Sequence, residues 1–224
     1  TDPELVLNGD FEELGSELVT NGTFDTDSDW SKGTGWSISN GSASYDGLNG
    51  TQQIFSNTGY SAVIGKTYKI TFDVLNQGNG NNTASFGGVV FSNTNLSIGS
   101  YVFYVTATNT GRFGIFGRDG DVFSIDNVSV QQVDPNDYWT LQNNTGTNTE
   151  ITSGHLIIET DGAYTQVSQS SVLVAANQYK LVYTISSSDN GDLGLVIDGN
   201  ITVSIPSSVG THTYYFTSHS TSLV

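Results

Sequence analysis

Tyr68-Lys69-Ile70-Thr71-Phe72 recurs 111 positions later as Tyr179-Lys180-Leu181-Val182-Tyr183. At the same offset, residues 99–103 (G-S-Y-V-F) align with residues 210–214 (G-T-H-T-Y). Separate patches that keep one order and one spacing indicate a tandem repeat. The chain of 224 residues is therefore predicted to form two domains, each of about 110 residues and large enough for its own core.

The residues around the first patch alternate with the period of a β-strand. In residues 66–74, Tyr68, Ile70, Phe72 and Val74 fall on one face, and mostly polar residues fall on the other. Such a pattern predicts a half-buried strand. By the same reasoning we expect strands at residues 101–105, 112–116 and 122–130, and in the second copy at residues 155–159, 178–185 and 212–217.

The composition favours strands and turns over helices. Only 12% of the residues are charged and 11% are aromatic, and Gly, Ser, Thr and Asn are abundant, which suits short strands joined by many turns. We expect an all-β protein of two tandem antiparallel β-sandwich domains in jelly-roll order. The immunoglobulin order is disfavoured because the chain has no cysteine for its inter-sheet disulfide.

The repeat also predicts the domain boundaries. We expect an N-terminal extension at residues 1–17, a first module at residues 18–133, a linker at residues 134–137 and a second module at residues 138–224. Pro135 follows an acidic residue and favours a turn between the modules. The first copy continues through residues 114–130, and their counterparts would lie beyond Val224, so the second module is expected to lack its final strands.

The N-terminal extension contains a smaller repeat. Residues 5–12 (L-V-L-N-G-D-F-E) recur as residues 18–25 (L-V-T-N-G-T-F-D), and the second of these directly precedes the body of the first module. The first is then spare: it is either the opening of a lost neighbouring module or an extra strand that pairs elsewhere. One hypothesis is that residues 4–11 complete a neighbouring copy, which would give a head-to-tail filament. The rival hypothesis is a sequence that continues past Val224.

Charge and motifs exclude several classes of function. The formal net charge of -16 repels nucleic-acid phosphates and anionic lipids, so we expect no nucleic-acid partner. No apolar run approaches the roughly 20 residues of a membrane span, so no membrane insertion is expected. His155, His212 and His219 lack zinc spacing, and no nucleophile or phosphate-loop motif is present. We therefore expect no enzymatic activity.

Four short motifs, taken in order, resemble a known family. They are Asn-Gly-x-Phe-Asp/Glu at residues 21–25, Trp-x-Ile at residues 36–38, Gly-Lys-x-Tyr-x-Ile-x-Phe at residues 65–72, and Ile-Asp-Asn-Val-Ser-Val at residues 125–130. Together they resemble carbohydrate-binding modules of the family 4, 9 and 22 type, which are β-sandwich jelly rolls. Similar short modules are found in structural proteins of marine bacteriophage virions. The resemblance covers residues 18–133 well and residues 138–224 in part.

The resemblance implies a structural calcium ion. Modules of this kind often hold calcium between the acidic residue of the first motif and the aspartate of the last strand, which correspond to Asp25 and Asp126. Calcium takes six to eight oxygen ligands, and two carboxylates with loop carbonyls would join the two ends of the domain. The alternative is that both aspartates only cap turns.

The resemblance also implies a glycan-binding site. Sugar rings stack on exposed aromatic faces, and the candidates are Trp30, Trp36, Tyr45, Tyr60 and Tyr101. The alternative is that most of these side chains belong to the core, as the two-residue spacing of Trp36 and Ile38 suggests.

These observations lead to a function hypothesis. We expect a non-catalytic extracellular or virion-surface protein, a decoration, fibre, appendage or adhesion subunit that recognises a cell-surface glycan or polysaccharide. It is also expected to associate with itself or with other structural subunits. One alternative is a carbohydrate-binding accessory region of a secreted polysaccharide-degrading enzyme. Another is a filament subunit that assembles by strand donation.

Overall fold

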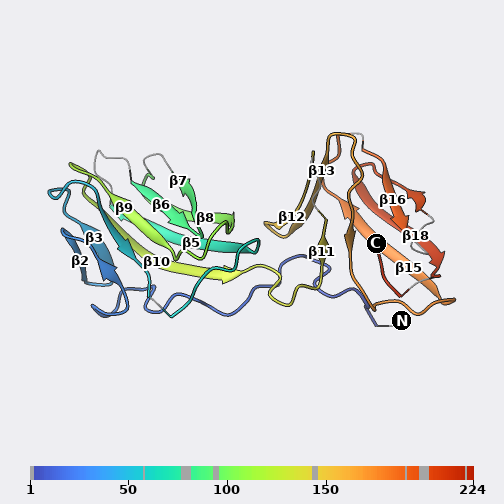
Figure 1. Cartoon of the computed structure of the whole chain (residues 1–224), viewed down its shortest axis with the longest axis horizontal. Coiled ribbons are helices and arrows are strands. Elements are labelled where there is room, and N and C mark those ends of the chain that lie inside the picture. Colours follow the sequence, from blue (N-terminus) through green and yellow to red (C-terminus); the bar gives the residue numbers. More distant parts are fainter. Residues whose placement is uncertain are drawn as a thin grey trace. The chain divides into compact units, whose positions relative to one another are not determined.

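The computed structural model describes residues 3–57, 59–76, 82–92, 96–142, 146–189, 191–196, 202–219 and 221–224. The chain divides into two compact units (Figure 1). The continuous unit is Glu12–Pro135. The discontinuous unit combines Thr1–Phe11 with Asn136–Val224. This division differs from the expected one at the N-terminus, because the first residues of the chain belong with the second half of the sequence.

The continuous unit is a β-sandwich of two five-stranded sheets, with strand orders β1-β4-β9-β6-β7 and β2-β3-β10-β5-β8. Every pair of neighbouring strands in these sheets is antiparallel. The strands are β1 Ser31–Lys32, β2 Trp36–Ser39, β3 Ser42–Tyr45, β4 Gln52–Phe55, β5 Thr67–Asn76, β6 Thr83–Phe86, β7 Val89–Ser92, β8 Gly99–Thr106, β9 Gly114–Gly117 and β10 Phe123–Gln132. The strands expected in this part of the sequence are confirmed, with small shifts at their ends.

The inward faces of both sheets build one core. Ile54 and Phe86 come from the first sheet, while Tyr68, Ile70 and Phe72 come from the second, and all are at most 1% exposed. Within residues 67–74, the alternation of β5 thus places Tyr68, Ile70, Phe72 and Val74 inside and the polar residues outside, as the sequence predicts. Burial of these apolar side chains is the main stabilising contribution to the unit.

The described residues of the discontinuous unit form four two-stranded antiparallel sheets: β11-β14, β12-β13, β15-β18 and β16-β17. Its strands are β11 Thr140–Leu141, β12 Thr147–Thr152, β13 His155–Thr160, β14 Val167–Ser168, β15 Gln178–Ile185, β16 Leu193–Val196, β17 Thr202–Ile205 and β18 Gly210–Thr217. They follow the order of the strands in the continuous unit, and β15 and β18 lie 111 positions after the matching residues of β5 and β8. The described residues of the whole chain form no helix, so the all-β prediction is confirmed.

Two strands of the continuous unit have no counterpart among the described residues of the discontinuous unit. They are β9 and β10, each of which is the central strand of its five-stranded sheet. Each five-stranded sheet of the continuous unit therefore corresponds to two separate strand pairs in the discontinuous unit. The expectation that the second module lacks its final strands stays a prediction.

The N-terminal repeat forms the same turn in both units. In the continuous unit, Phe24 N donates to Asn21 O at 3.2 Å, and Trp30 Nε1 donates to the same carbonyl at 3.0 Å. In the discontinuous unit, Phe11 N donates to Asn8 O at 3.2 Å, and Trp139 Nε1 donates to Asn8 O at 3.0 Å. The ring of each phenylalanine packs on its tryptophan, with centroids 4.7 Å and 5.3 Å apart.

A side-chain amide fixes the N-terminal segment to the discontinuous unit. Gln169 Oε1 accepts from Leu7 N at 2.7 Å, and Gln169 Nε2 donates to Leu7 O at 2.9 Å. The corresponding contact in the continuous unit runs from Thr20 N to Asn57 Oδ1 at 3.0 Å. The segment expected to be spare thus supplies the opening turn of the second module. It forms a turn instead of the expected extra strand, because Asn8 and Phe11 adopt left-handed backbone angles.

Candidate functional site

The outer face of the β2-β3-β10-β5-β8 sheet gathers polar side chains on a regular surface. Because the side chains of a strand alternate, Lys69, Thr71 and Asp73 of β5 point away from the core that Tyr68, Ile70 and Phe72 enter. The neighbouring strands contribute the residues paired with them: Ser100, Val102 and Tyr104 from β8, and Asp126, Ser129 and Gln131 from β10. We call this surface the outer face of the continuous unit.

Asp73 is the charged centre of the outer face. Its Oδ2 accepts a hydrogen bond from Asn127 Nδ2 at 2.7 Å. Hydrogen bonds from the Ser100 and Asn127 side chains lower the pKa of the Asp73 carboxyl group, because they favour its charged form. Asn127 reaches this position through a bulge in β10 between Asp126 and Ser129, where Asn127 has a φ of 52°. The outer face therefore presents a fixed carboxylate beside an amide.

A tyrosine that is at least partly exposed lies opposite a lysine on each unit. Tyr104 of β8 pairs with Lys69 of β5, and 111 positions later Tyr215 of β18 pairs with Lys180 of β15. Tyr104 is partly exposed and Tyr215 is 71% exposed. Neither ring is buried in a core, and the same tyrosine and lysine stand at this place in both copies.

The structure places three of the predicted stacking residues in the core. Trp30, Trp36 and Tyr45 are 8%, 7% and 1% exposed. The Trp36 ring packs edge-on against Phe123, with centroids 5.3 Å apart, and Tyr45 Oη donates to Gly50 O. Sugar stacking at these positions finds no support here, because the ring faces are covered by other side chains.

The other two predicted aromatics are partly buried. Tyr60 packs against the core, and its hydroxyl lies 2.7 Å from Ser56 Oγ and accepts from Phe113 N at 3.3 Å. Burial raises the pKa of the Tyr60 hydroxyl. Tyr101 stacks on Phe72, with centroids 5.8 Å apart, and points to the inner side of β8. Both residues therefore support the fold more directly than they offer an open ring face.

The predicted calcium ligands make local contacts. Asp25 Oδ2 accepts from Thr23 Oγ1 at 2.7 Å, and Asp126 Oδ1 accepts from Asn127 N at 2.6 Å. Among the described residues, no group of three or more acidic, histidine or cysteine side chains gathers in a way that could hold a metal ion. Calcium at Asp25 and Asp126 thus stays a prediction, and both side chains make the turn contacts of the alternative interpretation.

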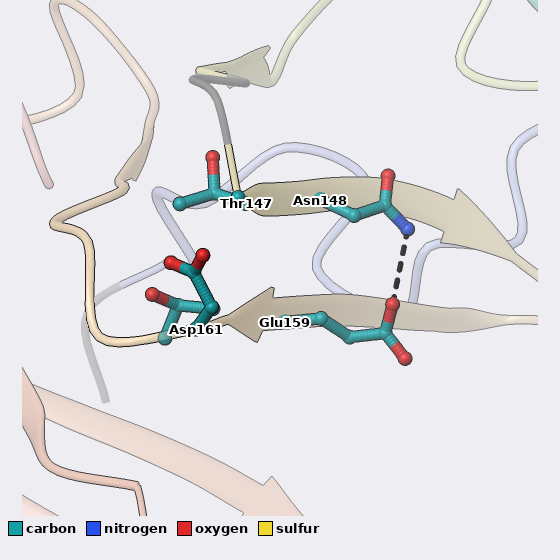
Figure 2. Close-up of a pocket in the computed structure, with 6 residues that line it drawn as sticks. Thr147, Asn148, Glu159 and Asp161 are labelled. Atoms are coloured by element: carbon teal, nitrogen blue, oxygen red, sulfur yellow. Dashed lines mark hydrogen bonds between the residues drawn. The ribbon is translucent and has the colours of Figure 1, made fainter.

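A shallow hollow of 420 Å³ lies at one end of the β12-β13 hairpin. Its lining includes Thr147, Asn148, Glu159 and Asp161 (Figure 2). Figure 2 shows the Glu159 carboxyl group turned toward Asn148, whose Nδ2 donates to Glu159 Oε2 at 3.3 Å. This carboxylate is engaged by an amide and is turned away from Asp161, so the hollow does not present the facing pair of carboxylates that glycoside hydrolysis uses.

Sequence reasoning missed the outer-face residues Tyr104, Asn127 and Tyr215. The signal that could have found the two tyrosines was present: residues 99–106 alternate, so Tyr104 falls on the face opposite Tyr101, Phe103 and Val105. Asn127 was not predictable in this way, because the bulge in β10 changes which face the following residues occupy.

No protein-family model matches the chain, and no curated protein matches it. Among solved structures, the chain is similar to the N-terminal CBM22-1-CBM22-2 tandem domain of Xyn10C from Paenibacillus barcinonensis. The similarity covers 94% of this chain and 83% of that one, with 8% sequence identity and a TM-score of 0.30. In the part of the chain that the structure describes, no helix is long and apolar enough to cross a membrane.

Proposed function

We propose that this protein is a non-catalytic, extracellular glycan-binding protein that serves as an adhesion or structural subunit, on a virion or at a cell surface. The observation that carries the proposal is a tyrosine opposite a lysine at the same place in both units: Tyr104, which is partly exposed, with Lys69, and Tyr215, which is 71% exposed, with Lys180. A tyrosine ring offers a flat apolar surface to a sugar ring, and its hydroxyl and the neighbouring lysine donate hydrogen bonds to sugar oxygens.

The two units would not bind alike. On the continuous unit, Asp73 and Asn127 provide a carboxylate and an amide on the same sheet face as Tyr104. The position 111 residues after Asp73 is Thr184, whose hydroxyl lies 2.9 Å from that of Thr211. We therefore assign the stronger site to the continuous unit, because an ionised acceptor makes stronger hydrogen bonds to hydroxyl groups than a neutral one. The discontinuous unit adds a second contact on a long polysaccharide.

Binding of polysaccharides to Tyr104→Ala, Tyr215→Ala and the double variant tests this proposal. Loss of a contact worth about 1.4 kcal/mol weakens binding about tenfold. We expect that effect for Tyr104→Ala and a smaller one for Tyr215→Ala. The double variant should bind more weakly than either, because it also loses the gain from two linked sites.

Tyr164→Ala is the matched control, since Tyr164 is 61% exposed and lies outside both sheet faces. Tyr104→Phe should retain most of the binding, because it keeps the ring. Equal binding by wild type and the double variant would contradict the proposed site. Absence of binding to every polysaccharide tested, with an intact fold, would assign the protein a purely structural role.

A further inference from the structure

The peptide bond between Asp134 and Pro135 lies at the end of the continuous unit, next to a strained residue. Asp134 has a φ of 47°, in the left-handed region that residues other than glycine seldom adopt. The proline that follows restricts Asp134 further, because its ring clashes with the backbone of the preceding residue unless that residue is extended. Such a conformation costs free energy, and it persists only where the surrounding structure imposes it.

Contacts on both sides of this bond impose the conformation. Asp134 N donates to Glu13 O at 3.0 Å. Pro135 packs against Gly15, since a Cβ atom added to Gly15 would lie 3.3 Å from Pro135 Cβ. The residues before and after the peptide bond are therefore both held against the segment that begins the continuous unit.

Burial distinguishes a protease from the chain's own groups as the agent that could cut this bond. Asp134 is 7% exposed and Pro135 is partly exposed. A protease must bind several extended residues around the bond that it cuts, and the buried, left-handed Asp134 opposes such binding. The carboxyl group of Asp134 needs no access from outside. A well-oriented intramolecular group can act at an effective concentration of about 10⁵–10⁸ M.

The proline decides which reaction this carboxyl group can undergo. After most aspartates, the backbone nitrogen of the next residue can attack the side-chain carbonyl carbon and form a succinimide. Pro135 has no backbone N–H proton to lose, so this route is closed. The route that stays open is attack by a carboxyl oxygen of Asp134 on the main-chain carbonyl carbon of the same residue.

We propose that the Asp134-Pro135 peptide bond is a site of self-cleavage. A carboxyl oxygen of Asp134 bonds to the main-chain carbonyl carbon, and the bond from this carbon to Pro135 N breaks. The carboxyl proton passes to the nitrogen, which leaves as a secondary amine. Water then hydrolyses the five-membered cyclic anhydride, which restores the side-chain carboxyl group and leaves a new C-terminal carboxyl group. The net reaction is hydrolysis of one peptide bond, and it releases the strain at Asp134.

The two pieces stay associated after this cleavage. The discontinuous unit also contains residues 1–11, which remain joined to the continuous unit. Phe11 packs on Trp139 with ring centroids 5.3 Å apart, and Gln169 makes two hydrogen bonds with Leu7. These contacts hold the piece that begins at Pro135. Cleavage thus converts a covalent connection into one that can dissociate.

The rate of cleavage in the folded chain tests the proposal. The full chain is incubated at about pH 5, where a fraction of its carboxyl groups is protonated, and circular dichroism verifies that it stays folded. Mass spectrometry measures the fragments, with Asp2-Pro3, the other Asp-Pro bond of the sequence, as the internal reference. We expect Asp134-Pro135 to be cleaved at least about tenfold faster, which corresponds to about 1.4 kcal/mol of activation free energy.

Unfolding the chain in guanidinium chloride at the same pH supplies the reference state. The two Asp-Pro bonds should then be cleaved at similar rates, because the contacts that strain Asp134 are absent. Cleavage of Asp134-Pro135 in the folded chain that is no faster than cleavage of Asp2-Pro3, or no faster than in the unfolded chain, would overturn the proposal.

Two variants separate self-cleavage from a contaminating protease. Asp134→Asn keeps the size of the side chain and tolerates the left-handed region, but it lacks the carboxyl nucleophile. Asp134→Glu keeps the carboxyl group, but its attack would have to close a six-membered ring. We expect each to lower the rate at least about tenfold, because the reacting atoms no longer meet in the same geometry. Asp2→Asn is the matched control and should leave this rate unchanged. Cleavage of either Asp134 variant at the wild-type rate would overturn the proposal.

Size-exclusion chromatography of the cleaved chain tests whether the pieces stay associated. Fragments 1–134 and 135–224 should elute together. Gln169→Ala should make them separate at a higher protein concentration than in the wild type, because it removes both hydrogen bonds to Leu7. Asn57→Ala, which removes the corresponding contact of the continuous unit, should have no such effect. Separate elution of the wild-type fragments at every concentration would overturn the association, and equal effects of the two variants would overturn its assignment to residues 1–11.

Discussion

Asp73 is a single residue whose charge affects both stability and the proposed site. Hydrogen bonds from Ser100 and Asn127 lower its pKa in the folded protein. Its carboxylate therefore stabilises the fold above the unfolded-state pKa of about 3.9. This contribution is lost as the pH falls through the lower, folded-state pKa.

Asp73→Asn should lower the unfolding midpoint of the continuous unit at pH 7 by a few degrees. Solvent screens this partly exposed group, so the expected loss is about 0.5 kcal/mol. The variant should also lose less stability than the wild type between pH 5 and pH 2. Thermal unfolding followed by circular dichroism at pH 7 and pH 3 measures both effects. Asp119→Asn, at an exposed turn position, is the control, and an identical pH response of the Asp73 variant and the wild type would contradict the prediction.

At the residue scale, the sequence identified the candidate aromatic residues, but it did not show which of them are buried. Alternation identified the inner face of β5 correctly, since Tyr68, Ile70 and Phe72 are buried. Trp30 lies before the first strand, where no periodicity applies, and its burial depends on the turn carbonyl of Asn21 that its indole reaches. The same limit applies to Asn127, whose orientation depends on a bulge that no spacing rule indicates.

The N-terminal turn at Leu5–Phe11 is an element whose removal should affect one unit only. Deletion of residues 1–11 removes the Phe11 ring from Trp139 and the Leu7 hydrogen bonds from Gln169. We expect the unfolding midpoint of the discontinuous unit to fall by about 10 °C, which corresponds to roughly 2 kcal/mol. The continuous unit should be unchanged, because its own turn uses residues 18–24.

Hydrogen exchange of each unit and tryptophan fluorescence measure this effect. A red shift from Trp139 is expected in the deletion variant. The point variant Gln169→Ala should reproduce part of the loss, whereas Asn57→Ala should destabilise the continuous unit instead. Unchanged exchange in β14 and β15 after the deletion would contradict the assignment.

At the element scale, the strands could be predicted from the sequence, but the pairing of the N-terminal turn with Trp139 could not. The period of residues 66–74 requires a strand whatever its neighbours are. The 13-residue repeat predicted that its second copy opens the first module, but it left the role of the first copy open. The first opening lies beside Trp139, about 130 residues further along the chain, and such long-range pairing leaves no periodic signal.

For the whole molecule, we expect two separate unfolding transitions. The continuous unit has a large cluster of buried residues drawn from two five-stranded sheets. In the described residues of the discontinuous unit, the buried cluster consists of Leu173, Leu195, Ile205 and Leu223. Since stability follows buried apolar area, the discontinuous unit should unfold at the lower temperature.

Differential scanning calorimetry should resolve the two transitions, and hydrogen exchange at intermediate temperature should assign them. Ile70→Ala in the continuous unit should shift only the upper transition, by roughly 2–5 kcal/mol of stability. Leu195→Ala, the matched variant in the discontinuous unit, should shift only the lower one. A single cooperative transition, shifted by both substitutions, would contradict independent unfolding.

The ends of the continuous unit are held together by its own sheet. Gly15 N donates to Gln132 O at 2.8 Å, and Asp134 N donates to Glu13 O at 3.0 Å. Folding of this unit therefore brings Glu12 and Pro135 close together, and the two parts of the discontinuous unit with them. The roughly 120 residues that separate the two parts of the discontinuous unit then act as a connection of only a few residues. This lowers the entropic cost of bringing the two parts together by about 3 kcal/mol. The geometry thus favours one order of folding, in which the inserted unit folds first and the chain's first residues then find their partners.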